Sequence, residues 1–282
     1  MNNYPRISFN ECGFEEANIV VFGAPFDGTT SFRPGTRFGP QAIRNDFYGI
    51  ESYSPLLNKD LEDFKLYDAG DLVLPFGNTK NALNMIKEQV SDILNKGKFP
   101  FLLGGEHLVS LPAIESVYAK YENLRIIHLD AHTDLRDDYL GEKYSHSTVM
   151  RRVWDLVGDK KIYQFGIRSG TKEEFSWSES GHTYINKYDL SGIDTVIEQI
   201  KKYPIYITID LDVLDPSLFP GTGTPEAGGI SYKELEKLFT SISQLNVVGA
   251  DIVELSPHFD ASGVSTAVAC KVLREMILSI WI

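Results

Sequence analysis

Three ionisable side chains lie at alternate positions near the middle of the chain, where IIHLDAHTDLRDD leads from an apolar segment into Asp130, His132 and Asp134. In extended backbone, residues two apart point to the same face. If the backbone stays extended past Asp130, two carboxylates and an imidazole face the same way. Close carboxylates at a buried strand end lose hydration and repel each other, so we expect a cation between them.

Two other apolar segments end in similar chemistry. FPFLLGGEHLVS leads into Glu106 and His107, and YITIDLDVLDP ends in Asp210 and Asp212. Four converging carboxylates need two divalent ions to balance them, and carboxylate with imidazole but no thiolate favours Mn²⁺ over Zn²⁺. Two ions about 3.5–4 Å apart can hold a bridging hydroxide. The candidate metal ligands are His107, Asp130, His132, Asp134, Asp210 and Asp212.

Each motif alone has a simpler interpretation. An Asp-x-Asp at a strand end is often a turn or a helix cap, and a histidine after Gly-Gly is often a residue at the start of a helix. The occurrence of all three motifs at corresponding strand ends favours the metal interpretation. We expect His128, which lies in phase with the ligands but before the strand end, to pack in the core. His182 and His258 have no partner pattern, so we expect surface or supporting positions.

The elements that must position these residues alternate along the chain. Helical patterns over 79–97 (with Gly97 as C-cap), 231–239 (with a capping box of Ser231 and Glu234) and 265–281 separate or follow apolar, β-prone segments. This order predicts an α/β protein with a mainly parallel sheet, whose ligands bind beyond the carboxyl ends of the strands. The expected strands are 18–23, 64–70, 99–103, 124–130, 161–166, 182–186, 204–210 and 247–255.

Composition sets broader limits. The 282 residues are 43% hydrophobic with no linker-like tract, so we expect one domain over 1–282. No signal peptide and no membrane span are evident, and we expect a soluble cytoplasmic protein. The two cysteines, Cys12 and Cys270, are isolated, and reduced thiols are favoured although a disulfide stays open. A net charge of −12 argues against nucleic acid and suits a cationic substrate, although ordinary acidic solubility explains it more simply.

Six blocks of the chain resemble the ureohydrolase family, which includes arginases and agmatinases. GGEH, DAHTD and TIDLDVLDP are similar, in order and spacing, to the three metal-binding blocks of the family, and residues 31–40, 221–229 and 251–257 resemble its other recurring blocks. The resemblance extends from about Val20 to the last helix. It implies a three-layer α/β/α fold with an eight-stranded parallel sheet, two Mn²⁺ ions per subunit, hydrolysis of a guanidino compound to urea and an amine, and a homo-oligomer, as a hexamer or trimer.

The resemblance also implies roles for individual residues. It makes the six residues above the metal ligands, with Asp134 also assisting proton transfer from the bridging hydroxide. His146 becomes a proton shuttle that contacts substrate near its ordinary pKa, in a loop where Ser147 replaces a commoner glycine. Glu254 becomes the guanidinium-binding residue, which suits a planar carboxylate that can accept two parallel N–H bonds. An exposed loop position for His146 and a structural ion pair for Glu254 are the alternatives.

The loop after the central ligands bears on the substrate. It carries Asp137, Asp138 and Glu142 against Arg136 and Lys143. An acidic rim favours an ammonium tail over a carboxylate tail, and the block also resembles bacterial agmatinases most, so we expect agmatine to be cleaved to putrescine and urea in polyamine biosynthesis. The alternatives are a guanidinobutyrase, an arginase or a formimidoylglutamase, a related one-zinc deacetylase, and a non-catalytic metal-binding protein. The full ligand set disfavours the last two.

Overall fold

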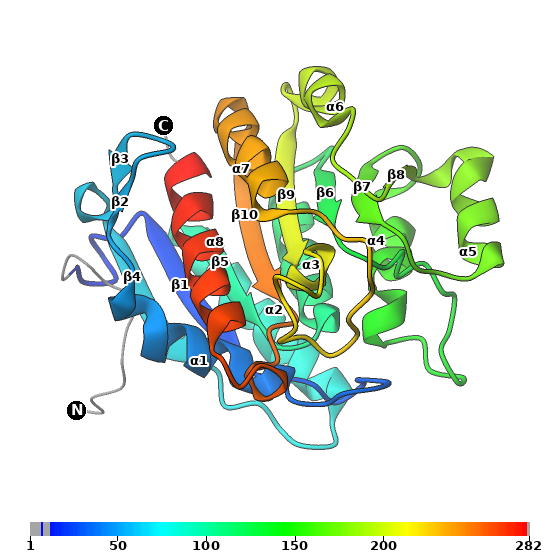
Figure 1. The fold of residues 1–282 in the computed structure, drawn as a ribbon, viewed down its shortest axis with the longest axis horizontal. Helices are drawn as coiled ribbons and strands as arrows, with labels where there is room; N and C mark the ends of the chain where they lie inside the picture. The colour runs from blue at the N-terminus through cyan, green and yellow to red at the C-terminus, as the bar shows by residue number, and fades with distance from the viewer. Residues whose placement is uncertain (1–6, 8–11, 281–282) are drawn as a thin grey trace.

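A parallel sheet forms the centre of the molecule (Figure 1). The structure is a computed structural model that describes residue 7 and residues 12–280. Within these residues eight strands form one sheet in the order β4-β1-β5-β10-β9-β6-β7-β8, and all of its strand pairs are parallel. All eight predicted strands and the α/β fold class are confirmed. The strands are β1 (Ile19–Ala24), β4 (Leu66–Asp71), β5 (Phe99–Gly104), β6 (Arg125–Leu129), β7 (Ile162–Ile167), β8 (Tyr184–Lys187), β9 (Pro204–Asp210) and β10 (Asn246–Val253).

Helices cover both faces of the sheet, which gives the three layers that the resemblance implies (Figure 1). Side chains of β9 alternate between two apolar cores, with Ile205, Ile207 and Ile209 in one core and Tyr206 in the other. The first core contains side chains of α1 (Gly39–Asp46), α6 (Ile193–Ile200), α7 (Tyr232–Ser241) and α8 (Val264–Ile280). The second contains those of α2 (Thr79–Asn95), α3 (Ser110–Lys120) and α4 (Val149–Val157), while α5 (Lys172–Trp177) lies beside β8.

The local helix signals are largely as expected. Ser231 and Glu234 form the predicted capping box of α7. Gly97 has a φ of 71°, but it lies just beyond the C-cap of α2, which is Lys96. The short antiparallel pair β2 (Tyr53–Ser54) and β3 (Lys59–Asp60) was not predicted, because strands of two residues show no alternation.

Both ends of the chain extend beyond the described residues. Most of the N-terminal stretch in which we expect no signal peptide lies outside them, as does position 281 of the predicted last helix. The preceding part of that helix, including Met276 and Leu278, is buried within the chain. Across the described residues, no helix combines the length and apolar character that a membrane span requires. Neither Cys12 nor Cys270 is in a disulfide.

One tier of the sheet interior is polar. The register pairs Gln164 of β7 with His128 of β6, His128 with Thr208 of β9, and Thr208 with Asp251 of β10. Paired residues of neighbouring parallel strands point to the same face, so these four side chains form one transverse row, which we call the polar row. All four are 0% exposed. Groups buried in this way must be hydrogen-bonded to one another or to their neighbours. On β6 the row lies two positions before Asp130, so it stands directly behind the candidate ligands.

The turn between β5 and His107 depends on glycine. A Cβ on Gly105 would lie 1.9 Å from the carbonyl oxygen of Phe26, which is backbone and cannot rotate away. Gly105→Ala is therefore expected to lower the free energy of unfolding by about 3 kcal/mol, measured by urea denaturation. Gly49→Ala is the control, since a Cβ there meets nothing within 4 Å. Equal stability of the two variants would contradict the expectation.

Candidate metal centre

Ligands from three strand ends converge at the carboxyl edge of the sheet. His107 follows β5, Asp130 and Asp134 follow β6, and Asp210 ends β9. The Nδ1 atom of His107 lies 3.1 Å from an Oδ2 of Asp130, 3.3 Å from that of Asp210 and 3.4 Å from that of Asp134. A single ring nitrogen thus faces three carboxylate oxygens.

A second group of ligand atoms adjoins the first. The Nδ1 atom of His132 lies 3.0 Å from Oδ2 of Asp212 and 3.4 Å from Oδ1 of Asp130. Asp130 therefore turns one oxygen toward each imidazole, and the two groups share this carboxylate. The structure brings all six predicted ligands together in a form that suits two neighbouring metal ions bridged by a carboxylate.

The donor set fits divalent metal ions by a direct structural test. The buried Nδ1 atom of His107 has no hydrogen-bond partner. Its Nε2 atom lies 2.9 Å from the hydroxyl of Thr208, which donates its only proton to Asp251 at 2.5 Å. The hydroxyl must therefore accept from Nε2–H, which leaves Nδ1 facing the carboxylates. An ion coordinated by Nδ1 and those oxygens would satisfy all of them.

The electrostatics of the centre favour positive charge. Burial lowers the pKa of His107 and His132, but the facing carboxylates outweigh burial and raise both imidazole pKa values well above the ordinary range. Burial and the charge of Asp130 raise the pKa of Asp134 well above its usual value. Divalent ions supply this missing positive charge more fully than protons do, and they compete with protons for the same atoms.

Backbone geometry differs from the sequence-based expectation at two site residues. The alternation argument assumed extended backbone through Asp134, but β6 ends at Leu129 and Asp134 has a φ of 52°. Glu254 also has a left-handed φ, of 68°. Such a conformation is unfavourable for residues with a Cβ and persists only where the surroundings impose it. Asp134 reaches the centre by this turn of the backbone, not by strand alternation.

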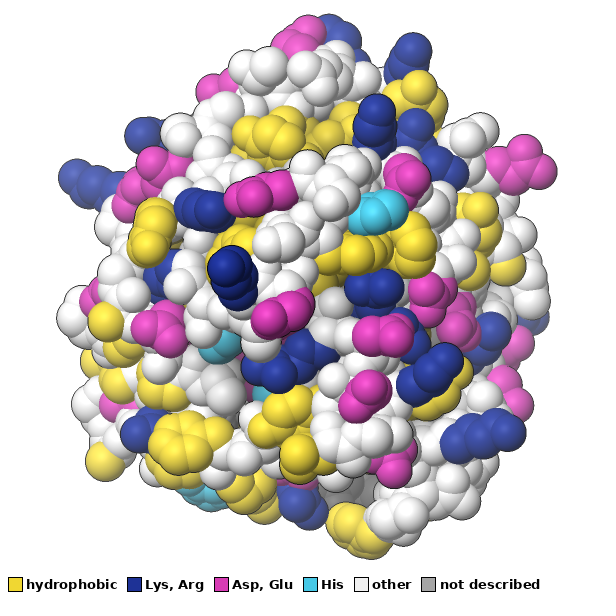
Figure 2. All heavy atoms as spheres, turned by 90° about the vertical axis from the view of Figure 1, so that its right-hand side faces the viewer, with side chains coloured by type: hydrophobic (Ala, Val, Ile, Leu, Met, Phe, Trp, Pro, Cys, Tyr) yellow, Lys and Arg dark blue, Asp and Glu magenta, His cyan; other side chains and the backbone are white. Residues whose placement is uncertain are grey.

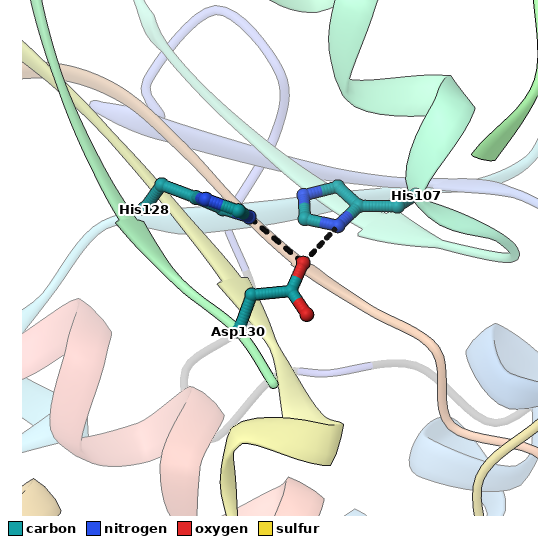
Figure 3. Close-up of side chains that lie close together, drawn as sticks. All are labelled: His107, His128 and Asp130. Atoms are coloured by element: carbon teal, nitrogen blue, oxygen red, sulfur yellow. Dashed lines mark hydrogen bonds and ion pairs between the residues drawn. The ribbon is translucent and has the colours of Figure 1, made fainter. Parts of the chain in front are cut away.

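His128 is buried, as predicted, but it does more than pack. Its Nε2 atom lies 2.8 Å from Oδ2 of Asp130, the oxygen that also faces His107 (Figure 3). Sequence analysis missed this contact, although the phase of His128 with Asp130 was a usable signal. The other two histidines pack elsewhere, with His182 stacked on Trp177 and His258 edge-on to Phe38.

A cleft of about 250 Å³ opens onto the centre and is lined by His132, Asp134 and His146, among others. The Nε2 atom of His146 lies 3.0 Å from the hydroxyl of Ser31. Burial, together with the neighbouring His132 and His107 imidazoles, lowers the pKa of His146 to about 4, so the expectation of an ordinary pKa is wrong. Ser147 lies in the 3₁₀ turn His146–Thr148, where no left-handed φ demands glycine.

Glu254 is held beside the ligands and is only 4% exposed. Its Oε1 atom accepts a hydrogen bond from the backbone N–H of His107 at 2.7 Å, so this described contact is with backbone and not with a basic side chain. Burial and the charge of Glu106 raise the pKa of Glu254 to about 8. Glu106, which sequence analysis left without a role, accepts from Thr29 and Thr30. A cationic group beside Glu254 would offset burial and the charge of Glu106, and so would favour the ionised carboxylate.

The acidic rim expected from the loop sequence does not form at this cleft. Asp137 pairs with Arg152 at 2.8 Å, and Asp138 accepts from a backbone N–H of its own loop; neither they nor Glu142 line the cleft. Besides the predicted site residues, the charged side chains that line the cleft are Glu174 and Arg136, whose Oε2 and Nε atoms are 3.8 Å apart. On the molecular face nearest α5, Figure 2 likewise shows acidic and basic side chains interspersed.

Comparisons with known proteins agree with this geometry. The family model of the arginase family matches residues 17–279. An agmatinase of Bacillus anthracis is 52% identical over 272 residues, which cover 95% of this chain and 93% of the relative. A crystal structure from Clostridium difficile, of a protein thought to be an agmatinase, has a TM-score of 0.93 at 52% identity and covers 95% of this chain and 98% of that one. The agmatine ureohydrolase of Thermoplasma volcanium has a TM-score of 0.89 at 34% identity, covering 98% and 94%.

The hydrogen bond from His107 to Thr208 yields a test of the centre. Thr208→Val keeps the shape of the side chain but removes the acceptor of His107 Nε2–H, so we expect Mn²⁺ affinity to fall by about tenfold or more. Isothermal titration calorimetry on metal-free protein measures the change. Thr240→Val is the control, because the hydroxyl of Thr240 donates to Lys237 on the exposed side of α7. Unchanged affinity in Thr208→Val would contradict the assigned role of Nδ1.

Proposed function

The chain belongs to the arginase family, and we propose that it hydrolyses agmatine to putrescine and urea with two Mn²⁺ ions. The similarity to its relatives shows that it is a ureohydrolase of the agmatinase type. The finer proposals are the substrate, the metal and the roles of individual residues. The observation that supports the metal and the ligand roles is the convergence of two imidazoles and four carboxylates, among them the shared Asp130. The agmatinase relatives support the choice of substrate.

The six ligands would hold the ions, with His107 and His132 on opposite sides of Asp130. Carboxylate-rich, thiolate-free coordination suits Mn²⁺. When bound, two such ions supply Lewis acidity that activates water for attack on the guanidino carbon. The remaining steps fall to the protein's own side chains.

Glu254 would orient the substrate. Its buried carboxylate, with a pKa raised by burial and by Glu106, gains most from a cationic partner, and a guanidinium can donate two parallel N–H bonds to it. This contact holds the guanidino carbon facing the activated water. In such a closed site, correct orientation removes much of the entropic part of the barrier.

Proton transfer would involve Asp134 and His146, both of which line the cleft. As the C–O bond to water forms and the C–N bond breaks, Asp134 takes one proton of the water and passes it to the leaving nitrogen. The second proton of the water leaves the urea oxygen, directly or through solvent, so that the amine departs as an ammonium ion. His146, with a pKa of about 4, is neutral at pH 7 and exchanges protons with solvent as an acceptor. Its contact with Ser31 keeps the ring at the cleft wall.

The tail of the substrate would meet two opposite charges. An ammonium tail gains from Glu174, whereas a carboxylate tail gains from Arg136, and both side chains line the cleft. The geometry alone therefore admits agmatine or guanidinobutyrate. The agmatinase relatives favour the ammonium tail, and guanidinobutyrate is the second candidate because of Arg136. A cytoplasmic homo-oligomer, with no nucleic acid or membrane partner, completes the proposal.

The deciding experiment measures urea release. Mn²⁺-loaded protein is offered agmatine, arginine, guanidinobutyrate and formiminoglutamate separately, with a chelated sample of each. We expect chelator-sensitive turnover of agmatine at least tenfold above the others in kcat/KM. If the protein prefers a carboxylate-tailed compound, that compound and not agmatine is the substrate. If metal-loaded protein turns over none of the four compounds, the proposed function is wrong.

Substitution of Glu254 tests its role in the same assay. Glu254→Gln keeps the size of the side chain but removes the charge that the guanidinium needs, so kcat/KM for agmatine should fall by about 10²-fold or more, while two Mn²⁺ ions still bind. Glu173→Gln is the matched control, since Glu173 lines a neighbouring cavity and not the cleft. Equal losses in both variants would indicate a non-specific effect of charge.

Arg136 offers a separate test of tail recognition. Arg136→Gln removes the cation that pairs with Glu174, an interaction of about 1 kcal/mol when one partner is partly exposed. The KM for agmatine should fall about fivefold, and that for guanidinobutyrate should rise. Lys143→Gln removes a like charge from the same loop but away from the cleft lining, and should change neither value. A rise in the agmatine KM of Arg136→Gln would mean that Arg136 assists the ammonium-tailed substrate.

A further inference from the structure

We propose that His128 is a positioning residue of the metal centre, a neutral hydrogen-bond donor that holds Asp130 in the orientation in which both ions can share it. The inference rests on the proposed two-metal function. It assigns a role to a residue of the polar row that is neither a ligand nor in the cleft lining. The observations that carry it are the hydrogen bonds on the two ring nitrogens.

Gln164 determines which nitrogen of His128 carries the proton. The Nε2 atom of Gln164 lies 2.7 Å from the carbonyl oxygen of Thr133 and 2.9 Å from Nδ1 of His128, while its Oε1 accepts from the hydroxyl of Thr183 at 3.2 Å. A flipped amide would set its oxygen against the Thr133 carbonyl. The amide nitrogen must therefore donate to both atoms, and Nδ1 of His128 must accept.

An imidazole that accepts at Nδ1 carries its hydrogen at Nε2. That atom lies 2.8 Å from Oδ2 of Asp130, so His128 donates to this carboxylate. A protonated nitrogen offers no lone pair to a metal, so His128 is not a ligand, although its ring nitrogen lies within 4.8 Å of ligand atoms of His107 and Asp130.

Asp130 is thereby held from both sides. Oδ2 accepts from His128, and Oδ1 accepts from the backbone N–H of His132 at 2.6 Å. Each oxygen also faces one ligand imidazole, as Figure 3 shows for Oδ2 and His107, and keeps a lone pair that a metal ion beside that imidazole would use. Without His128 the backbone would still hold Oδ1, but Oδ2 would be free to turn away from His107. The loss should therefore affect one ion more than the other.

The experiment compares three variants by Mn²⁺ calorimetry and pulsed electron paramagnetic resonance. His128→Phe removes the donor and keeps a ring, whereas His128→Gln places an N–H at a similar reach. His182→Phe is the matched control, because His182 contacts Asp159, Trp154 and Trp177 rather than the ligands. Thermal unfolding of each metal-free variant separates lost folding from lost metal binding.

We expect His128→Phe to lower the affinity for one of the two Mn²⁺ ions by about tenfold or more. The Mn²⁺ affinities of His128→Gln and His182→Phe should stay within about threefold of those of the parent protein. In parent and His128→Gln the ¹⁴N couplings should be the same, from the two ligand imidazoles. If His128→Phe bound both ions as tightly as the parent, His128 would be a packing residue only. If His128→Gln lost a ¹⁴N coupling, His128 would be a direct ligand. Either result overturns the proposal.

The urea assay keeps the two proposals apart. Suppose that the parent protein binds two Mn²⁺ ions and cleaves agmatine, and that His128→Phe binds Mn²⁺ as tightly. The proposed function would then be supported and the positioning role of His128 would be wrong. If the parent protein binds both ions but releases no urea, the proposed function is wrong. The effect of His128→Phe on affinity would then still decide this inference. Should His128→Phe fail to fold, His128→Leu, which also removes the donor, takes its place with the same expected and contradicting results.

Discussion

The structure depends on one electrostatic constraint, the burial of several carboxylates around a single point. Asp130, Asp210 and Asp212 are between 0% and 3% exposed, so water cannot screen their mutual repulsion. Protons relieve such repulsion only in part, whereas the two proposed divalent ions would remove it and use the same oxygens as ligands. The free energy of folding and the capacity for catalysis are therefore linked at this edge of the sheet, and the sheet must be rigid enough to keep the carboxylates together.

The parallel sheet supplies that rigidity through its register. His128, Thr208 and Asp251 pair across neighbouring strands, so hydrogen bonds from the polar row reach Asp130 and His107 without any flexible segment between them. A polar row inside a sheet would be costly if any member lacked a partner. Here each member has a hydrogen-bond partner. Because the strand register fixes the positions of these side chains, their hydrogen bonds in turn fix the orientation of Asp130 and His107.

Sequence analysis could predict the features that repeat along the chain and not those that depend on contacts between distant segments. Alternation and strand order identified eight strands, and the polar residues that follow the strand ends identified the ligands that the structure brings together, although Asp134 arrives there by a turn and not by alternation. The bond from Gln164 to His128 joins two strands and has no sequence pattern, so His128 was assigned to core packing. Left-handed backbone at Asp134 and Glu254 is set by surrounding structure and cannot be inferred from residue type, since neither is glycine.

Loop charge was a wrong guide to the charges that line the cleft, for a related reason. The sequence gives each charge equal weight, but in the fold Asp137 is neutralised by Arg152, while Glu174, from a helix about forty residues further along, lines the cleft. Glu174 also accepts from the hydroxyl of Thr133 and the N–H of Leu135, both in the ligand segment. One carboxylate thus braces the two neighbours of Asp134 and also lines the cleft. If the proposed tail recognition holds, specificity would be tied to the rigid centre, and a change of tail preference would be easier through the partly exposed Arg136 than through the buried Glu174.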